Sequence, residues 1–378
     1  MDHHKDGKEH FLSGPRIQPA SISPGMKVED LMDGSFLAYN AGRLQQAARL
    51  LVEKVLEPDV TVGLSLSGAM SPAGVTLSSL VPLVKNGFVD WIVSTGANLY
   101  HDAHFGLGLA LHRGSHEMDD RKLLEAEVIR IYDVVLEYDV LLQTDRFLRE
   151  VMNHPDLSRP MGTAELHHEL GRHLAAREEK LGVEDTCLLT VAYRAGVPCY
   201  VPSPGDSSIG MNVAEMALRE SGPRIDPSRD VNETAAIVHD AQRTGKSAVL
   251  VLGGGSPKNF ILQTEPQLQE VLGVESRGHD YFIQVTDARP DTGGLSGATP
   301  GEAVSWGKVD PAKLTDSVVV YCDTTIATPL LTAYVLSRHE PRPLKRIYDR
   351  RNDIYEKLVS DVRARNLEPD ELRGSRKP

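Results

Sequence analysis

The sequence predicts an α/β protein with a doubly wound, mostly parallel sheet, and three observations lead to this prediction. Short apolar runs alternate with segments of helical periodicity along most of the chain. Five of these runs end in small or polar residues, as strands do at the carboxyl edge of such a sheet. No fixed-period repeat or long Ser/Gly/Pro linker divides the 378 residues, a length that can bury a substantial core.

The first βαβ unit is expected near the N-terminus. Residues 28–57 carry apolar side chains at helical spacing and predict one or two helices. A buried strand is expected over 60–68, followed by a helix over 73–88 with Gly87 near its C-terminal cap. The apolar run in 89–98 predicts a second strand that ends in a glycine-containing turn. Strand, helix and strand at this spacing indicate parallel pairing.

The remaining elements follow the same alternation. Residues 123–152 are expected to be mostly helical, and 159–181 and 233–246 are expected to form further helices. A strand is expected in each of four later segments: 186–210, 247–260, 281–291 and 316–339, the last of which continues through an acidic turn into a helix. The predicted division is an N-terminal arm (1–34), one α/β domain (35–345), and a charged C-terminal helix and tail (346–378).

Composition and charge exclude several classes of function. The net charge of −12 disfavours broad electrostatic attraction to nucleic acid or anionic lipid. The three cysteines show no CxxC spacing, and Cys187 and Cys199 lie in apolar runs, which predicts buried thiols rather than a disulfide framework or zinc module. No apolar run approaches the ~20 residues that span a bilayer, and the start lacks an apolar signal core. The prediction is a cytoplasmic protein without membrane contact.

The strand-end loops predict a nucleotide crevice. They comprise residues 65–71, 94–98, 203–208, 253–259 and 322–325. Glycines there allow close backbone approach, helix starts attract phosphate, and Asp206 or Asp323 could accept ribose hydrogen bonds. Loops in α/β proteins are often rich in Gly, Ser and Asp, but five such loops favour a ligand site. Neither GxGxxG nor GxxxxGK[ST] occurs in the chain.

A glycine-rich loop near residue 300 carries the second candidate site. The stretch "TGGLSGATPGEAVSWGKVDP" (292–311) contains a single lysine, Lys308, close to Trp306 and Glu302. A lysine in a flexible loop is ordinarily solvated and inert. From the residues alone, the prediction is a nucleotide-using enzyme with Lys308 and Glu302 near its site.

Three segments resemble the deoxyhypusine synthase family. They are "VLVLGGGSPKNFI" (249–261), "SGATPGEAVSWGK" (296–308) and "YCDTTIATPLL" (321–331), and the resemblance extends over most of residues 35–340. In combination these segments are far more specific than any single glycine-rich loop. The chain looks like the bacterial branch of the family, described as deoxyhypusine synthase-like or homospermidine synthase.

The resemblance implies a deoxyhypusine synthase-like NAD-binding fold and a homotetramer with active sites at dimer interfaces. It also implies that spermidine is oxidised by NAD, that 1,3-diaminopropane leaves, and that the aminobutyl group is held as an imine on a lysine. That group then passes to an acceptor amine and is reduced by the same cofactor. The acceptor is a lysine of the translation factor 5A precursor in deoxyhypusine synthases, and putrescine in homospermidine synthases.

Carried onto this chain, the resemblance makes Lys308 the imine-forming residue. Such a lysine must be unprotonated, and an apolar setting lowers its pKa. Trp306 would supply part of that setting and stack over a cationic amine, while Glu302 would pair with an ammonium group. The matching NAD positions are Ser67, Gly68, Thr95, Gly96, Asp206, Ser208, Gly254, Gly255, Ser296 and Asp323.

The part of the predicted site that would recognise the amine substrate departs from the family pattern. A proton-accepting histidine is expected after the lysine that follows the triple glycine, but Asn259 stands there and cannot act as a base near pH 7. Thr292 and Leu295 replace expected carboxylates, and Met211 replaces an expected aspartate.

The remaining anionic and basic groups near the loops are candidates to compensate. Asp287 and Asp291 are predicted to supply replacement charge, and His101 follows the "STGAN" turn that should approach NAD. Together with Asn259, these three are the predicted substrate-binding residues.

Two groups of histidines have a plainer interpretation. His101, His104, His112 and His116 could form a metal site or supply a base, but solvated side chains are favoured, and no metal site is predicted. Surface exposure is expected for His167, His168 and His173 on their charged helix.

Small-amine transfer of the homospermidine type is therefore the leading functional hypothesis. A deoxyhypusine synthase acting on a protein lysine is the first alternative. A non-catalytic regulatory protein that retains NAD is the second, favoured by the altered amine residues and opposed by the retained Lys308, Trp306 and Glu302.

Overall fold

The computed structural model describes residues 11–365, so the first ten residues of the predicted arm and residues 366–378 of the predicted C-terminal helix and tail (346–378) lie outside it. Its helices are α2 (Val28–Ser35), α3 (Tyr39–Leu50), α4 (Val81–Lys85), α5 (Gly96–Gly106), α6 (Asp120–Glu125), α7 (Tyr138–Met152), α8 (Thr163–Leu181), α9 (Leu188–Ala195), α10 (Ser208–Ala217), α11 (Pro227–Thr244), α12 (Gly255–Pro266), α13 (Pro300–Ser305), α14 (Thr324–Arg338) and α15 (Arg351–Arg365). Its strands are β1 (Val60–Leu66), β2 (Trp91–Ser94), β3 (His112–Arg113), β4 (Val128–Ile131), β5 (Val134–Glu137), β6 (Pro160–Met161), β7 (Cys199–Tyr200), β8 (Arg224–Ile225), β9 (Lys246–Leu252), β10 (Tyr281–Thr286) and β11 (Ser317–Tyr321).

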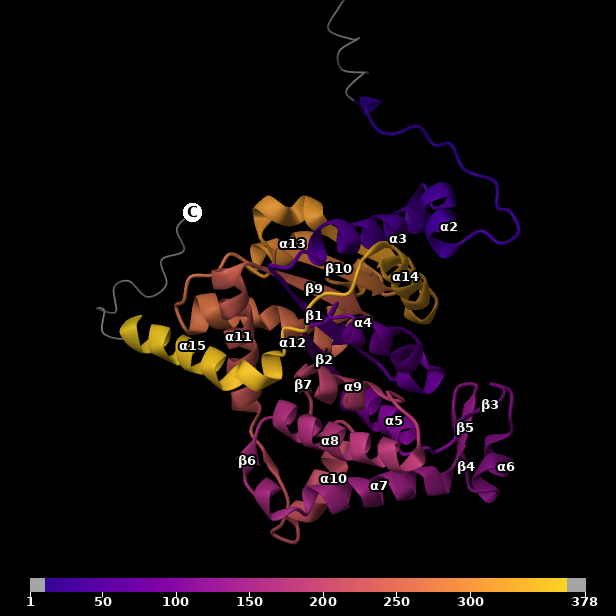
Figure 1. Cartoon of the computed structure of the whole chain (residues 1–378), viewed down its shortest axis with the longest axis vertical. Coiled ribbons are helices and arrows are strands. Elements are labelled where there is room, and N and C mark those ends of the chain that lie inside the picture. The colour runs from indigo at the N-terminus through magenta and orange to yellow at the C-terminus, as the bar shows by residue number, and fades with distance from the viewer. Residues whose placement is uncertain (1–10, 366–378) are drawn as a thin grey trace, which may run out of the picture.

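A six-stranded sheet in the order β11-β10-β9-β1-β2-β7 forms the centre of the molecule (Figure 1). All five strand pairings are parallel. The chain builds outward from β1 through β2 to β7, then returns to the other side of β1 and continues through β9 and β10 to β11. The sheet is therefore doubly wound, as the sequence predicts, and its order reverses between β1 and β9.

Helices cover both faces of the sheet. On one face, α3, α4, α9 and α14 join a large apolar core with the inward side chains of β1 and β9. On the other face, α11, α12 and α15 pack against Trp91, Val249 and Phe282. Figure 1 shows α11 and α15 on one side of the sheet and α3 and α14 on the other. Alternate residues along each buried strand thus point into two separate clusters.

Gly63 in the central strand β1 makes room for the largest side chain of the core. In the parallel register it lies opposite Trp91 of β2. A Cβ at Gly63 would come within 2.6 Å of the fully buried indole. Any larger residue there would displace Trp91 from the second cluster.

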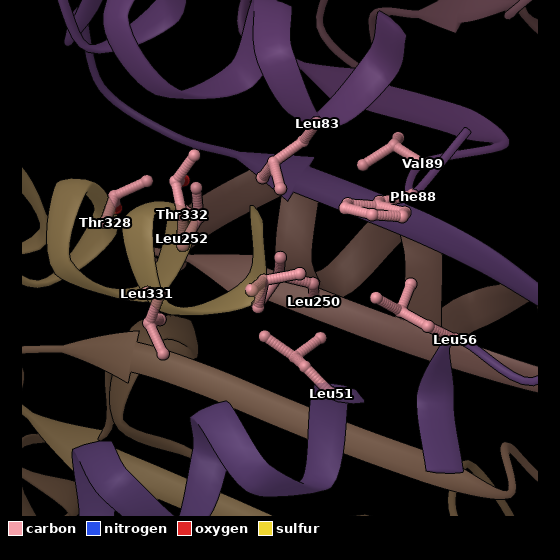
Figure 2. Close-up of a pocket in the computed structure, with 11 residues that line it drawn as sticks. Leu51, Leu56, Leu83, Phe88, Val89, Leu250, Leu252, Thr328, Leu331 and Thr332 are labelled. Carbon is pink, nitrogen blue, oxygen red and sulfur yellow. The ribbon is translucent and has the colours of Figure 1, made fainter. Parts of the chain in front are cut away.

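A small void marks where α14 meets the sheet and α4. Figure 2 shows leucines such as Leu250 and Leu331 around it, together with Phe88 and the hydroxyl-bearing Thr328 and Thr332. Its volume is about 20 Å³, far below the several hundred cubic ångströms of a ligand pocket. It therefore belongs to the core and not to a binding site.

The expectation that residues 123–152 are mostly helical is wrong for 128–137. Strands β4 and β5 form an antiparallel hairpin there, and β3 joins them in a three-stranded sheet. The run "VIRI" is half-buried and β-branched, which favours a strand over a helix. Figure 1 shows this hairpin with α6 at one end of the molecule, away from the central sheet.

Two further observations concern the cysteines and the helices. Cys187 and Cys199 are buried and free, which confirms the predicted buried thiols. Within residues 11–365, no helix combines the length and the apolar character that crossing a bilayer requires.

A buried ion pair fixes the segment that follows α14 to the edge of the core. Arg342 donates to Asp90 Oδ2 at 3.1 Å and to the backbone oxygens of Gly87 and Val60 at 2.8 and 3.2 Å. Burial raises the pKa of Asp90, while the neighbouring Arg342 guanidinium opposes that shift. Both side chains are almost completely buried, and Arg342 supplies the largest compensating charge for Asp90, with a smaller contribution from Lys345.

Replacing this arginine should be strongly destabilising. We expect Arg342→Met to lower the free energy of unfolding by about 3–5 kcal/mol, because it removes the main compensating charge of a carboxylate in the core. Urea unfolding followed by circular dichroism measures this change. Arg219→Met, which removes only the exposed pair with Glu215, is the control and should cost about 1 kcal/mol or less. Equal effects of the two substitutions would contradict the argument.

Candidate active site

The carboxyl edge of the sheet at its switch point brings three predicted cofactor loops together. Ser67 follows β1, and its Oγ accepts a hydrogen bond of 3.1 Å from the amide of Gly254, which follows β9. The next amide, that of Gly255, donates to Ser296 Oγ at 2.9 Å. Four of the predicted cofactor positions therefore lie within direct contact of one another, although they are separated by up to 229 positions in sequence (67 to 296).

Two glycines leave the crevice open to a ligand. Gly68 and Gly255 have φ of +68° and +58°, a left-handed conformation that favours glycine. A Cβ at Gly68 would meet nothing within 4 Å, so the backbone there faces open space. Because α12 begins at Gly255, the positive end of its helix dipole also points to this edge, which suits a phosphate. The residues present therefore fit a dinucleotide.

The loops after β2 and β7 form the next part of the crevice. Thr95 donates from Oγ1 to the carbonyl of Gly68 at 2.6 Å and caps α5. Gly96 packs so closely on the loop before α10 that a Cβ would lie 2.3 Å from Ser207 Oγ. Ser208 begins α10, and Asp206 is exposed beside it.

Asp323 lies apart from this cluster. It follows the edge strand β11, which β10 separates from β9. Its carboxylate accepts from the hydroxyl of Thr325 and from the amide of Thr325 at 2.7 Å, and it caps α14. The hydroxyl hydrogen bond contributes most to lowering its pKa. A capping role accounts for this aspartate without a nucleotide.

A cavity of about 280 Å³ adjoins the crevice and contains the second set of predicted residues. Its described lining comprises Lys258, Asn259, Leu262, Gln263, Phe282, Leu295, Ala298, Thr299, Glu302, Ala303, Trp306 and Lys308. The three predicted catalytic residues and Asn259 are thus brought together. One wall is apolar, whereas two lysines and one carboxylate supply the charges.

Local sequence explains how Lys308 reaches the cavity. Thr299 caps α13, and the helix ends at Trp306 because Gly307 adopts a left-handed φ of +69°. The chain reverses, and the amide of Lys308 donates to Ala303 O at 3.0 Å. Lys308 Nζ then lies 3.4 Å from Asn259 Oδ1 and 5.7 Å from the centre of the Trp306 ring.

The environment of Lys308 favours its neutral form. The side chain is half-buried, and this burial lowers its pKa below the ordinary value near 10.5, although the Glu302 carboxylate opposes the shift. Trp306 is 54% exposed, so the indole forms a partly open wall of the cavity. A half-buried lysine of lowered pKa in a cavity can act as a nucleophile toward an aldehyde or an imine.

Lys258 is a component that was not identified as functional from the sequence. It is only 2% exposed, and its ammonium group donates to Gln284 Oε1 at 2.9 Å, Ser296 O at 3.1 Å and Ala298 O at 2.6 Å. Burial lowers its pKa to about 8. Its only sequence signal is its position in the first turn of the helix that follows the triple glycine. Lys258 ties the cofactor loop at Ser296 to the cavity wall.

Several predicted residues are not brought into the cavity. Asp287 and Asp291 are exposed, and neither is among the described side chains that line the cavity. Asp291 instead pairs with Arg289 at 2.5 Å. His101 does not line it either. Leu295 does line the cavity, where it presents an apolar surface in place of the expected carboxylate.

The histidine expectations need correction. His104 is buried, not solvated, and it bridges His101 Nδ1 at 3.1 Å and Thr144 Oγ1 at 2.8 Å. Burial lowers the pKa of His104 to about 3, so it is neutral. His112 and His116 are exposed, as expected. Across residues 11–365, no group of three or more His, Cys, Asp and Glu side chains is arranged to hold a metal ion.

The prediction of surface exposure for the histidines of α8 is wrong, because none of the three is exposed. His167 is buried and pairs through Nδ1 with Cys199 O at 2.9 Å. It lies one turn from Leu170 and next to Leu166 on the apolar face of the helix. His168 and His173 are half-buried, and His168 stacks on Tyr348.

Comparison with known proteins agrees with this arrangement. The deoxyhypusine synthase family model matches residues 31–335. A deoxyhypusine synthase-like protein of Nostoc punctiforme is 58% identical over 359 residues, which cover 95% of this chain and 92% of the relative. A probable deoxyhypusine synthase 2 of Methanosarcina acetivorans is 38% identical over 343 residues, which cover 89% and 93% of the two chains.

A solved structure shares the fold. A crystal structure assigned as deoxyhypusine synthase from Entamoeba histolytica aligns with a TM-score of 0.54 at 14% sequence identity, covering 87% of this chain and 99% of that one. The family match extends from α2 into α14 and includes every loop of the crevice and the cavity. The chain belongs to the deoxyhypusine synthase family of transferases.

Proposed function

We propose that this protein transfers an aminobutyl group from spermidine to a small acceptor amine such as putrescine, through an imine on Lys308. Family membership implies NAD-dependent aminobutyl transfer from spermidine. The observation that carries the proposal is the half-buried Lys308, whose pKa is lowered, beside Glu302 and Trp306 in a cavity that adjoins the cofactor crevice.

Lys308 is the proposed nucleophile. Its neutral amine attacks the oxidised carbon of spermidine and forms a carbon–nitrogen bond, and the bond to 1,3-diaminopropane breaks as that amine leaves with a proton. The acceptor amine then attacks the imine carbon in the same way, and the bond between that carbon and Lys308 breaks. Burial of Lys308 raises the fraction of neutral amine at physiological pH.

Glu302 and Trp306 are proposed to hold the substrate during this exchange. Once diaminopropane has left, the aminobutyl group retains one ammonium, and the cavity offers one carboxylate, that of Glu302, among its described lining residues. The indole of Trp306 lies 5.7 Å from Lys308 Nζ, where the imine would form, and can stabilise a cation over its ring.

NAD, when bound, would accept a hydride from the spermidine carbon and return it to the product, so that the overall transfer involves no net oxidation. The residues that fit it are Ser67, Gly68, Gly254 and Gly255 at the switch point, with Thr95 and Ser208 on the neighbouring loops. Through its hydrogen bonds to the carbonyls of Ser296 and Ala298, Lys258 would hold the cavity wall in a fixed position relative to that crevice.

The acceptor and the assembly belong to the same proposal. A cavity of about 280 Å³ suits a small diamine. Leu295 and Trp306 at the cavity and Ile326 at the start of α14 are more than half exposed, which supports a homotetramer in which a second copy covers the active site. The same exposed apolar residues would also suit a docked protein lysine, the alternative acceptor.

The covalent role of Lys308 can be tested by trapping. Borohydride added to the protein with NAD and labelled spermidine should attach label to Lys308, and mass spectrometry of peptides locates it. Lys308→Ala should lower turnover by roughly 10³-fold or more while leaving the fold intact, because no other group replaces the nucleophile. Lys313→Ala, outside the cavity lining, is the control. Label on Lys258 would contradict the assignment.

The charge of Glu302 should set the pH dependence of Lys308. Because the carboxylate raises the pKa of Lys308, Glu302→Gln should lower that pKa and leave more neutral amine. The rate of adduct formation between Lys308 and neutral butanal, trapped with cyanoborohydride at pH 7, should rise roughly two- to fivefold. Turnover of spermidine should fall, because its ammonium loses a partner.

Glu275→Gln provides the matched control for this experiment. Glu275 is exposed and is not among the groups that shift the pKa of Lys308. An unchanged or upward-shifted pH profile in Glu302→Gln would show that this carboxylate does not act on the lysine.

The acceptor is tested by product analysis. Purified protein incubated with NAD, spermidine and putrescine should release diaminopropane and form homospermidine, and the polyamines can be separated by chromatography. Diaminopropane without a new triamine would reject the small-amine acceptor. Transfer only after addition of a 5A-type protein would favour the deoxyhypusine alternative. No turnover with any acceptor would favour the non-catalytic one.

A further inference from the structure

A buried polar cluster lies behind the loop that carries Lys308. At its centre is Glu265, near the end of α12, whose side chain is fully buried. Gln242 donates from Nε2 to Glu265 Oε1 at 2.7 Å, and Ser276 Oγ is in hydrogen-bond contact with Glu265 Oε2 and, at 2.7 Å, with Gln242 Oε1. Gln269 donates to the same Oε2 at 3.4 Å. Because the single hydroxyl proton of Ser276 can serve only one of its two oxygen contacts, the cluster also accommodates a protonated Glu265, and burial raises the pKa of that carboxyl to about 7.

Gln269 connects this cluster to the catalytic loop. Its Nε2 also donates to the carbonyl oxygen of Gly307 at 2.9 Å. The contact is close, because a Cβ at Gly307 would lie 2.5 Å from Gln269 Oε1. Gln269 therefore holds the one residue whose left-handed backbone turns the chain toward Lys308.

The rest of the Lys308 backbone is fixed on its other side. Its carbonyl accepts from the amide of His279 at 3.1 Å, and Asp310 returns a hydrogen bond to His279 O at 3.2 Å. Val309 is fully buried. Of the two ends of this turn, the one at Gly307 is held by a side chain, that of Gln269.

We infer that Gln269, oriented by Glu265, is a positioning residue that aims Lys308 Nζ into the cavity. This inference rests on the proposed role of Lys308 as the nucleophile. Gln269 and Glu265 are not among the described residues that line the cavity, so they act through the backbone and not on the substrate. A misplacement of about 1 Å at a reacting atom can cost on the order of 100-fold in rate, so a single backbone hydrogen bond can matter.

The test measures adduct formation at Lys308 without any cofactor. Protein is incubated with butanal and cyanoborohydride over a range of pH, and peptide mass spectrometry gives the rate at each lysine. Gln269→Met keeps the length of the side chain but cannot donate. We expect the plateau rate at high pH to fall roughly tenfold, with the midpoint pH of the profile unchanged.

Two further variants make the result specific. Gln267, two residues before Gln269, donates a hydrogen bond to Asn232. Gln267→Met removes that bond and should leave the rate at Lys308 as in the wild type. Gln269→Glu cannot donate to Gly307 and places a second carboxylate beside Glu265, so it should lose at least as much as Gln269→Met. Thermal unfolding of each variant confirms that the fold is retained.

The outcomes separate this inference from the proposed function. Equal plateau rates in the wild type and Gln269→Met overturn the positioning role, as does an equal loss in Gln267→Met. A Lys308 that reacts with butanal no faster than Lys313 in the wild type overturns it as well. A wild-type Lys308 that takes up butanal and depends on Gln269, but never takes up label from spermidine, rejects the proposed function alone.

Discussion

The ammonium group of Lys258 is the constraint on which the geometry of the site depends. It is buried between β10 and the loop that leads into α13, and its three acceptors are neutral oxygens. Burying a charged amine without a carboxylate in direct contact is costly, and the pKa of about 8 reflects that cost. Loss of any acceptor would increase the cost, so the loop 296–298 is held firmly against the sheet.

This arrangement couples two sites that differ in chemistry. Ser296 bonds to Lys258 through its carbonyl and to the amide of Gly255 through its hydroxyl, so one residue belongs to both the cavity and the cofactor crevice. The crevice exists because the sheet order reverses between β1 and β9, which leaves the ends of these two strands uncovered. A shift of the loop at Ser296 would therefore move the amine cavity relative to the crevice.

The sequence predicted the elements whose signals are local. Apolar runs marked the central strands, and the glycines after them marked the crevice, because backbone conformation depends mainly on the residue itself. The β4–β5 hairpin was missed because its β-branched residues lie between two helical segments of similar hydrophobicity. His167 was missed because the many charged residues of α8 suggest an exposed helix, whereas one face of the helix is buried.

Residues that act through distant contacts could not be predicted in the same way. Lys258 and Gln269 gain their roles from backbone oxygens 38 to 40 positions away, and no composition or spacing rule indicates such pairs. Asp287 and Asp291 show the opposite error: their position near the loop suggested a role, but both side chains are exposed outside the cavity.

The charges of the cavity bear on how a polyamine could be accommodated. Spermidine carries three amines, whereas the described lining offers one carboxylate and two lysines of lowered pKa. An uncompensated ammonium in such a setting is costly, so the donor needs further anionic groups beyond the lining of this chain. A second copy over the exposed Leu295 and Trp306 could bring them, which would explain why these apolar side chains lie open beside the cavity. In the proposed tetramer, substrate binding and subunit association would then depend on the same surface.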